Sequence, residues 1–232
     1  MKTTKKKLLT FSYDDGVTQD IRLIELFNKY GMKATFNLNS MRLGQPRELV
    51  REGVTISHNK VKAEDVRYIY DGHEVAAHTL NHPLLPSIED EQRIIYEVEQ
   101  DRLNLSELCG YEVVGFAYPG GGVNFDSRVA SIIRENTGVR YCRTTVSSRN
   151  FELQDNLYEF KPSVYHHAEF DRLFELGEEF LRLETDEKKI FYVWGHAYEF
   201  DIHNTWDRFE EFLSMMSGKD DILYVTNKEA LL

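Results

Sequence analysis

Two adjacent carboxylates near the start of the chain are the first residues whose types could do chemistry. Asp14 and Asp15 stand before Gly16, directly after the β-rich run Lys7–Tyr13. Neighbouring carboxylates repel each other, which costs stability unless a positive charge lies close by. Asp-Gly is also a common turn sequence, so a turn or helix cap is the competing interpretation. The pair therefore indicates either a turn or a site that binds a cation.

A histidine pair with a spacing of four could provide the other ligands of a metal ion. His78 and His82 can both face one ion from a single helical turn or from a tight loop. Two imidazoles and one carboxylate leave coordination positions open for water and substrate, which is the catalytic rather than the structural pattern. The spacing alone is a weak signal and gains weight only from a nearby carboxylate.

A third histidine could move protons. His196 follows the strongly apolar run Ile190–Trp194, so it is either a hydrogen-bonded core residue or an acid–base group. Glu199 and Asp201 lie just beyond it and could orient the ring.

The turn Tyr118-Pro119-Gly120 is followed by two more glycines. Glycine lets a backbone N–H approach a ligand closely. A plain loop is the simpler alternative for this segment.

The elements that must position these groups alternate between β-rich runs and amphipathic helical stretches. Seven runs predict strands: Lys7–Tyr13, Ala34–Leu38, His73–His78, Val113–Tyr118, Val139–Thr144, Ile190–Trp194 and Ile222–Thr226. The stretches between them predict helices: Asp20–Tyr30 with Gly31 after its end, Ser87–Cys109 stopped by Gly110, Asp126–Asn136, Asp171–Glu184 and Thr205–Ser217. Ser87 with Asp90 three residues later resembles a capping box. Residues 145–165 are the least regular and could hold an insertion or a hairpin.

Strands that are separated by helices pair in parallel, so an open doubly wound sheet or a barrel is expected. Polar residues follow six of the predicted strands: Asp14 and Asp15, Asn37 and Asn39, His78 and His82, Tyr118 to Gly120, Arg143, and His196. The carboxyl ends of parallel strands face one crevice, where function resides in such folds. The six strand ends therefore predict one shared site.

Composition excludes several function classes. The formal net charge of −11 disfavours nucleic acid and anionic membrane surfaces as partners. No apolar run approaches the roughly 18 residues of a membrane span, and a 41% hydrophobic chain of 232 residues suits one domain, residues 1–232. Cys109 and Cys142 lie in apolar surroundings and are expected to be reduced thiols. The apolar stretch after Lys7 is too short for a signal peptide, so a cytoplasmic protein is expected.

Four segments together resemble the polysaccharide deacetylase family with the NodB homology domain, carbohydrate esterase family 4. Leu9-Thr10-Phe11-Ser12-Tyr13-Asp14-Asp15-Gly16 resembles the first family motif, and His78-Thr79-Leu80-Asn81-His82 matches the second. Phe116-Ala117-Tyr118-Pro119-Gly120 resembles the third, and Tyr192-Val193-Trp194-Gly195-His196 resembles the last. The resemblance spans residues 8 to 196, and the motifs occur in the family's order.

The resemblance implies an α/β fold, a distorted (β/α) barrel of about seven parallel strands. It implies a metal-dependent hydrolase of a non-peptide amide bond that deacetylates an N-acetylated sugar or oligosaccharide. Asp15, His78 and His82 would bind one divalent metal ion. Zinc is favoured for this ligand set, and nickel, cobalt or iron is also compatible. Asp14 would be the general base, His196 the general acid, and Gly120 the oxyanion donor, with Tyr118 and Pro119 beside it at the substrate.

This chain departs from the family pattern in three places. Ala117 stands where the third motif usually has Arg, Gly120 stands where an aromatic residue is usual, and no Asp-Trp motif is found in residues 145–165. We expect Arg143, at the end of the next strand, to replace the missing guanidinium and to orient Asp14. A surface position is the alternative for Arg143. Without a secretion signal, a small N-acylated sugar or another soluble amide is a more natural substrate than a cell-wall polymer.

The sequence also allows two other functions. The two-histidine, one-carboxylate set also suits a non-haem iron oxygenase, although such a site has no use for the adjacent Asp14. A catalytically weak carbohydrate-binding module that keeps its metal would fit the missing Arg, but it has no need of both Asp14 and His196.

Overall fold

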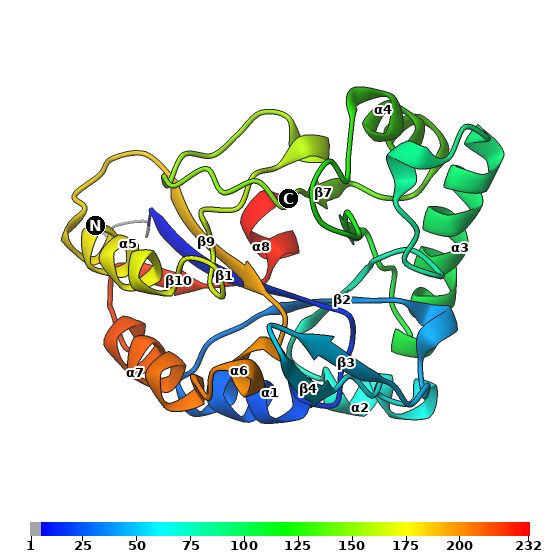
Figure 1. Ribbon diagram of the computed structural model, residues 1–232. Helices are drawn as coiled ribbons and strands as arrows, with labels where there is room; N and C mark the ends of the chain where they lie inside the picture. Colours follow the sequence, from blue (N-terminus) through cyan, green and yellow to red (C-terminus); the bar gives the residue numbers. More distant parts are fainter. Residues whose placement is uncertain (1–5) are drawn as a thin grey trace.

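A computed structural model describes residues 6–232 of the chain (Figure 1). The expectation of a cytoplasmic protein rests partly on the lysine-rich start of the chain. Residues Met1–Lys5 of that start lie outside the described residues. No helix in the described part is long and apolar enough to cross a membrane.

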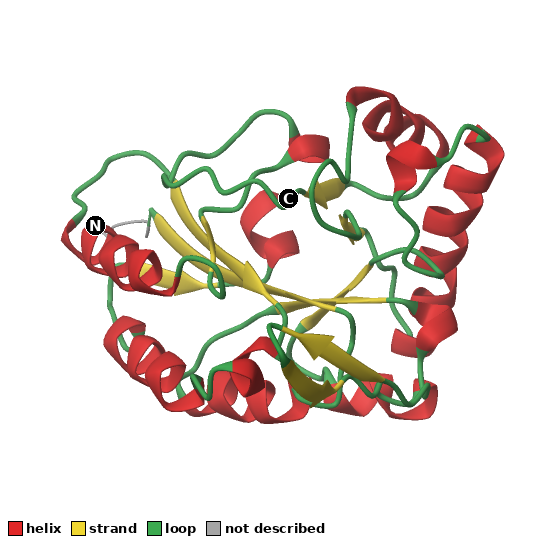
Figure 2. Ribbon diagram, viewed as in Figure 1, coloured by secondary structure: helices red, strands yellow, loops and turns green. Residues whose placement is uncertain are grey.

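One curled parallel sheet forms the centre of the fold, with helices around its outside (Figures 1 and 2). Its strands are β1 Lys7–Asp14, β2 Thr35–Leu38, β5 Glu74–Ala77, β6 Gly115–Ala117, β7 Tyr141–Arg143, β8 Val164–Tyr165, β9 Lys189–Gly195 and β10 Ile222–Tyr224. The order is β7-β6-β5-β2-β1-β9-β8. In addition, β10 pairs with the first residues of β1. This confirms the predicted distorted barrel of about seven parallel strands, including all seven predicted strand positions.

The irregular segment 145–165 leads from β7 to β8, the two edge strands of the sheet. Its residue Phe160 donates its backbone N–H to Cys142 of β7 and accepts one from Thr144. A few residues later the chain enters β8, which pairs with β9. The segment holds no hairpin: it contains the short 3₁₀ helix Leu157–Glu159 and the two residues of β8.

The helices of the described chain are α1 Asp20–Lys29, α2 Val66–Ile69, α3 Glu91–Cys109, α4 Ser127–Asn136, α5 Phe170–Arg182, α6 Glu199–Ile202, α7 Trp206–Met216 and α8 Asn227–Leu231. The expected start of the long helix at Ser87 is wrong. Asp90 caps α3 by accepting the backbone N–H of Gln92, because Ser87 already ends a 3₁₀ turn and donates its backbone N–H to Leu84. Gly110 ends α3 as expected, with a φ of 75° that favours glycine.

A small antiparallel hairpin was not expected from the sequence. Strands β3 Glu48–Arg51 and β4 Val54–Ser57 pair only with each other. Glu52 and Gly53 turn the chain with φ values of 53° and 78°, as in the tight turns that suit a twisted hairpin. Figure 1 shows the hairpin beside α6.

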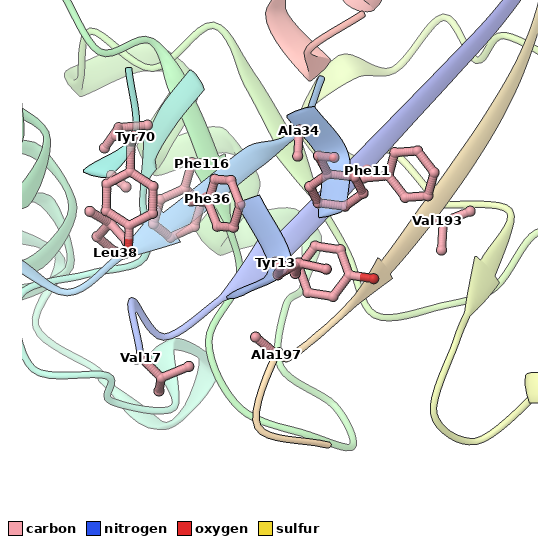
Figure 3. Packing of buried hydrophobic residues seen from close by; sticks show 14 of the residues in the cluster. Phe11, Tyr13, Val17, Ala34, Phe36, Leu38, Tyr70, Phe116, Val193 and Ala197 are labelled. Atoms are coloured by element: carbon pink, nitrogen blue, oxygen red, sulfur yellow. The ribbon is translucent and has the colours of Figure 1, made fainter. Parts of the chain in front are cut away.

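The main core lies between the sheet and the helices, and Figure 3 shows its aromatic centre around β1 and β2. Phe11 and Tyr13 of β1 and Phe36 of β2 are fully buried there. Every residue of β1 is buried, as is usual for a central parallel strand covered on both faces. Both cysteines, Cys109 and Cys142, are buried and free, as expected.

Candidate active site

The carboxyl ends of the strands open into one pocket of about 410 Å³. Asp14 ends β1, His78 follows β5, and His196 follows β9. Because these strands are parallel, residues far apart in the sequence reach the same edge. The pocket is lined by Asp14, Asp15, Arg51, His78, His82, Gly120, Gly121, Gly122, Thr145, Tyr165, Trp194, His196 and Tyr198.

Asp15, His78 and His82 converge as a set that could hold a metal ion. One donor atom from each lies within 4.8 Å of the others, and His82 Nε2 is 3.8 Å from Asp15 Oδ1. The Nδ1 atom of His78 lies 2.8 Å from the carbonyl oxygen of Ala117. An N–H donated there leaves Nε2 of His78 as the ligand nitrogen. The histidines come from a tight loop rather than a helix, in which Thr79 and His82 have positive φ values.

The protonation of these residues suits a metal ion, which needs neutral imidazoles and an ionised carboxylate. Burial lowers the pKa of His78 to about 4 and also lowers that of His82. Burial alone would raise the pKa of Asp15, but Lys60 and His58 outweigh it and hold this pKa well below its usual range. The donor set therefore fits a divalent ion without a change of protonation near neutral pH.

Asp14 is held by two partners and lies beside the candidate ligands. Asn37 donates to Oδ1 over 2.7 Å, and Arg143 donates to Oδ2 over 2.5 Å. His78 Nε2 and His196 Nε2 are each 4.0 Å from the same Oδ2 atom. Both oxygens of Asp14 are thus held in place, and Oδ2 also faces the two histidines.

Arg143 is fully buried rather than on the surface. Its guanidinium lies 4.4 Å from the ring centre of Trp194, which supports it by a cation–π contact. The structure therefore places a guanidinium on Asp14 although the family's usual Arg position is Ala117, a neighbour of Arg143 in the sheet register.

His196 is tied to a buried carboxylate from the following helix. Its Nδ1 atom lies 3.0 Å from Oε1 of Glu199, and its backbone N–H donates to Oε2. Burial opposes a charged imidazole, but Glu199 outweighs it and raises the pKa of His196. Burial likewise opposes a charged Glu199, and His196 reverses that effect and lowers the pKa of Glu199 to about 2. The Nε2 atom of His196 therefore faces the pocket and Asp14.

Three sequence expectations need correction. Tyr118 and Pro119 are buried and are not among the residues that line the pocket. The Tyr118 hydroxyl donates to the Tyr158 carbonyl and its backbone N–H to Arg143, so Gly120 alone of the predicted turn reaches the wall. Asp201 does not orient His196. It accepts hydrogen bonds from Gln19 and Trp206 instead.

Sequence reasoning missed several residues that surround the site. His58 Nε2 lies 3.2 Å from Asp15 Oδ2, and Lys60 Nζ lies 2.7 Å from the Asp15 carbonyl oxygen. Arg51 and Tyr165 both donate to Glu199. These residues carry no local motif. In the sequence, only the Glu52-Gly53 turn indicates a separate hairpin that carries Arg51 and His58 to the site.

Comparison with known proteins bears on the family and the fold. The sequence profile of the polysaccharide deacetylase family matches residues 1–141, while no curated protein matches the chain. A candidate polysaccharide deacetylase from Mycobacterium smegmatis aligns with a TM-score of 0.68 at 15% identity, over 99% of this chain and 90% of that one. A family 4 acetyl xylan esterase from Clostridium thermocellum, solved with a cobalt ion, aligns with a TM-score of 0.54 at 16% identity, over 96% and 89% of the two chains.

A CE4 family pseudoenzyme from Bacillus anthracis is also similar, with a TM-score of 0.56 at 18% identity over 100% of this chain and 66% of that one. At these identities the likenesses show the fold. The family profile covers more than half of the sequence, and the parallel sheet carries the motif residues to one pocket. The chain therefore belongs to the polysaccharide deacetylase family.

Proposed function

We propose that this protein is a metal-dependent hydrolase that removes an acetyl group from an N-acetylated sugar or oligosaccharide. Membership of the family supports a hydrolase that deacylates carbohydrate. The observation that carries the finer proposal is the position of Asp14. It stands outside the Asp15, His78 and His82 set, and its Oδ2 atom is 4.0 Å from both His78 and His196.

Asp15, His78 and His82 are the residues that would hold the ion, and zinc is the ion we propose, with nickel, cobalt or iron as alternatives. A divalent ion bound there would supply Lewis-acid polarisation of the substrate carbonyl and a lower pKa for water. His58 lies beside Asp15 at the back of the set, where it would orient that carboxylate.

Asp14 and His196 would divide the two proton transfers of amide hydrolysis. Asp14, held by Asn37 and Arg143, would accept a proton at Oδ2 from the attacking water. His196 would donate a proton from Nε2 to the departing amine nitrogen, since Glu199 raises its pKa and keeps it protonated at higher pH. An amine leaves poorly without that proton, so the His196–Glu199 pair supports an amide more than an activated ester as substrate.

The pocket wall fits a sugar derivative. Trp194 and Tyr165 stack on each other at 4.2 Å and both line the pocket, together with charged and hydroxyl-bearing groups. Its volume of about 410 Å³ is that of a small-ligand site. We further propose that residues 1–232 act as one catalytic domain, because a single sheet delivers the proposed base, acid and ligands.

Acetate release from N-acetylated chitooligosaccharides tests the proposal. Purified protein loaded with zinc should release acetate, and Asp14→Asn should lose roughly 10²–10⁴-fold in turnover, as for loss of a general base, while it keeps its zinc. If both proteins bind the oligosaccharide and neither releases acetate, the chain is a binding module and the proposal fails. Loss of zinc from Asp14→Asn would mean that the roles of Asp14 and Asp15 are reversed or shared.

A further inference from the structure

A second group of two histidines and one carboxylate lies on the surface outside the pocket. The donor atoms of Glu52, His167 and His203 lie within 4.8 Å of one another. His167 Nε2 is 2.9 Å from Glu52 Oε1, and His203 Nε2 is 2.8 Å from Glu52 Oε2. The two imidazole rings stack at 5.3 Å with an angle of 13° between their planes. Both rings thus present the same nitrogen to one carboxylate.

Three separate elements bring this group together. Glu52 is in the turn between β3 and β4, His167 is in the turn before α5, and His203 follows the last residue of α6. The His167 side chain is only 9% exposed, whereas those of Glu52 and His203 are 45% and 51% exposed. The group therefore has one nearly buried ligand and an open outer side that solvent can reach.

The donor types and distances suit a divalent transition-metal ion. Neutral imidazole nitrogen and carboxylate oxygen together suit zinc, nickel or copper more than calcium or magnesium. Ligands held about 2.0–2.1 Å from a tetrahedral ion are about 3.3 Å apart. The observed nitrogen–oxygen distances of 2.9 and 2.8 Å need to widen by only a few tenths of an ångström, and an exposed carboxylate can move that far.

We propose that Glu52, His167 and His203 form a second binding site for a divalent transition-metal ion, which clamps the β3–β4 hairpin to the barrel. Among the described strands, those of this hairpin pair only with each other. Backbone hydrogen bonds between residues 59–61 and residues 16–18 fix the base of the hairpin, and side chains such as Arg51 and Glu52 make the contacts of its turn end. Arg51, the residue before Glu52, donates to Glu199 over 2.9 Å and lines the pocket. An ion at Glu52 would thus steady the hairpin end from which Arg51 enters the pocket.

Zinc stoichiometry in the variant His203→Ala tests the site. Calorimetric titration with Zn²⁺ should give two equivalents for the wild-type protein and one for His203→Ala. Glu52→Gln, which keeps the side-chain shape without the charge, should also lose one equivalent. Glu48→Gln is the matched control, because it removes an exposed carboxylate from the same hairpin outside the group, and it should keep both.

The difference between wild type and His203→Ala decides the proposal, whatever the pocket binds. Equal zinc equivalents in these two proteins would overturn it. The variant His82→Ala should lose the pocket ion and keep the surface ion, so that failure of one site is distinguishable from failure of the other. In that variant zinc should slow hydrogen exchange in residues 50–55, and unchanged exchange there would overturn the clamping role.

Discussion

Replacing Glu199 by Gln should lower the pH at which this protein loses activity on its alkaline side. Glu199 lies 3.0 Å from Nδ1 of His196 and raises the pKa of that imidazole against the opposing effect of burial. Glutamine keeps nearly the same volume but removes the negative charge. Protonated His196 is the proposed acid, so its pKa sets the alkaline limb of the rate profile.

The size of the shift follows from the strength of the contact. A close contact with a charged partner, of the kind Glu199 makes with His196, contributes about 1.5–3 kcal/mol net. One unit of pKa corresponds to about 1.36 kcal/mol, so the alkaline limb should move by about 1–2 pH units. At a pH above both values, the protonated fraction of His196 falls by about 10- to 100-fold. The rate on an N-acetyl sugar should fall with it.

The assay is kcat as a function of pH for acetate release from an N-acetylated sugar and for a p-nitrophenyl acetate control. The amide should show the full shift, and the ester should show little, because p-nitrophenolate departs without a proton. Tyr165→Phe is the matched control. It removes one hydrogen bond to Glu199 but keeps the charge, so its alkaline limb should stay close to that of the wild-type protein.

An unchanged alkaline limb in Glu199→Gln would refute the assignment of His196 as the acid that Glu199 tunes. An equal loss on the amide and on the ester would show instead that the pair shapes the pocket. Zinc content and circular dichroism must match those of the wild-type protein, so that misfolding is not mistaken for either result.

Three further predictions test other parts of the site. His82→Ala should remove the pocket zinc, and full occupancy by metal analysis would contradict the ligand assignment. Arg143→Met should lower both turnover and the free energy of unfolding, because it leaves the buried Asp14 without its cation. A denaturant titration should show a loss of about 3–5 kcal/mol, and an unchanged unfolding midpoint would contradict this. Glu199 has its pKa lowered from 4.5 to about 2, so its contribution to stability is complete above about pH 4.5 and is lost as the pH falls toward about 2. The difference in unfolding free energy between wild type and Glu199→Gln should therefore shrink over that range, and a constant difference would show that the charge of Glu199 is not stabilising.

Much of the fold follows from local patterns in the sequence. The strands β1 and β9 are buried along nearly their whole length, and their apolar runs predict this directly. Parallel strands share one carboxyl edge, so the positions of Asp14, His78 and His196 after three such runs predict that they meet. The strand ends therefore predict one shared site, whereas the roles of Asp15, His78 and His82 as ligands follow from the family resemblance.

Other features depend on contacts between segments that carry no local pattern. The choice between a surface and a buried Arg143 required the register of β7 beside β6, which directs its guanidinium onto Asp14. The two-residue strand β8 is too short for any periodicity. The hairpin that delivers Arg51 and His58 is likewise defined by its tertiary contacts.

The sequence by itself determined the order of the elements, the strand ends that carry polar groups, and the family. Only the tertiary structure decided which charges offset each other inside the site. Lys60 and His58 are 45 and 43 residues from Asp15, and Glu52 is 115 residues from His167. The physical reason is that strand and helix periodicity reports burial along a single element, whereas ion pairs between elements arise only when the chain brings their ends together.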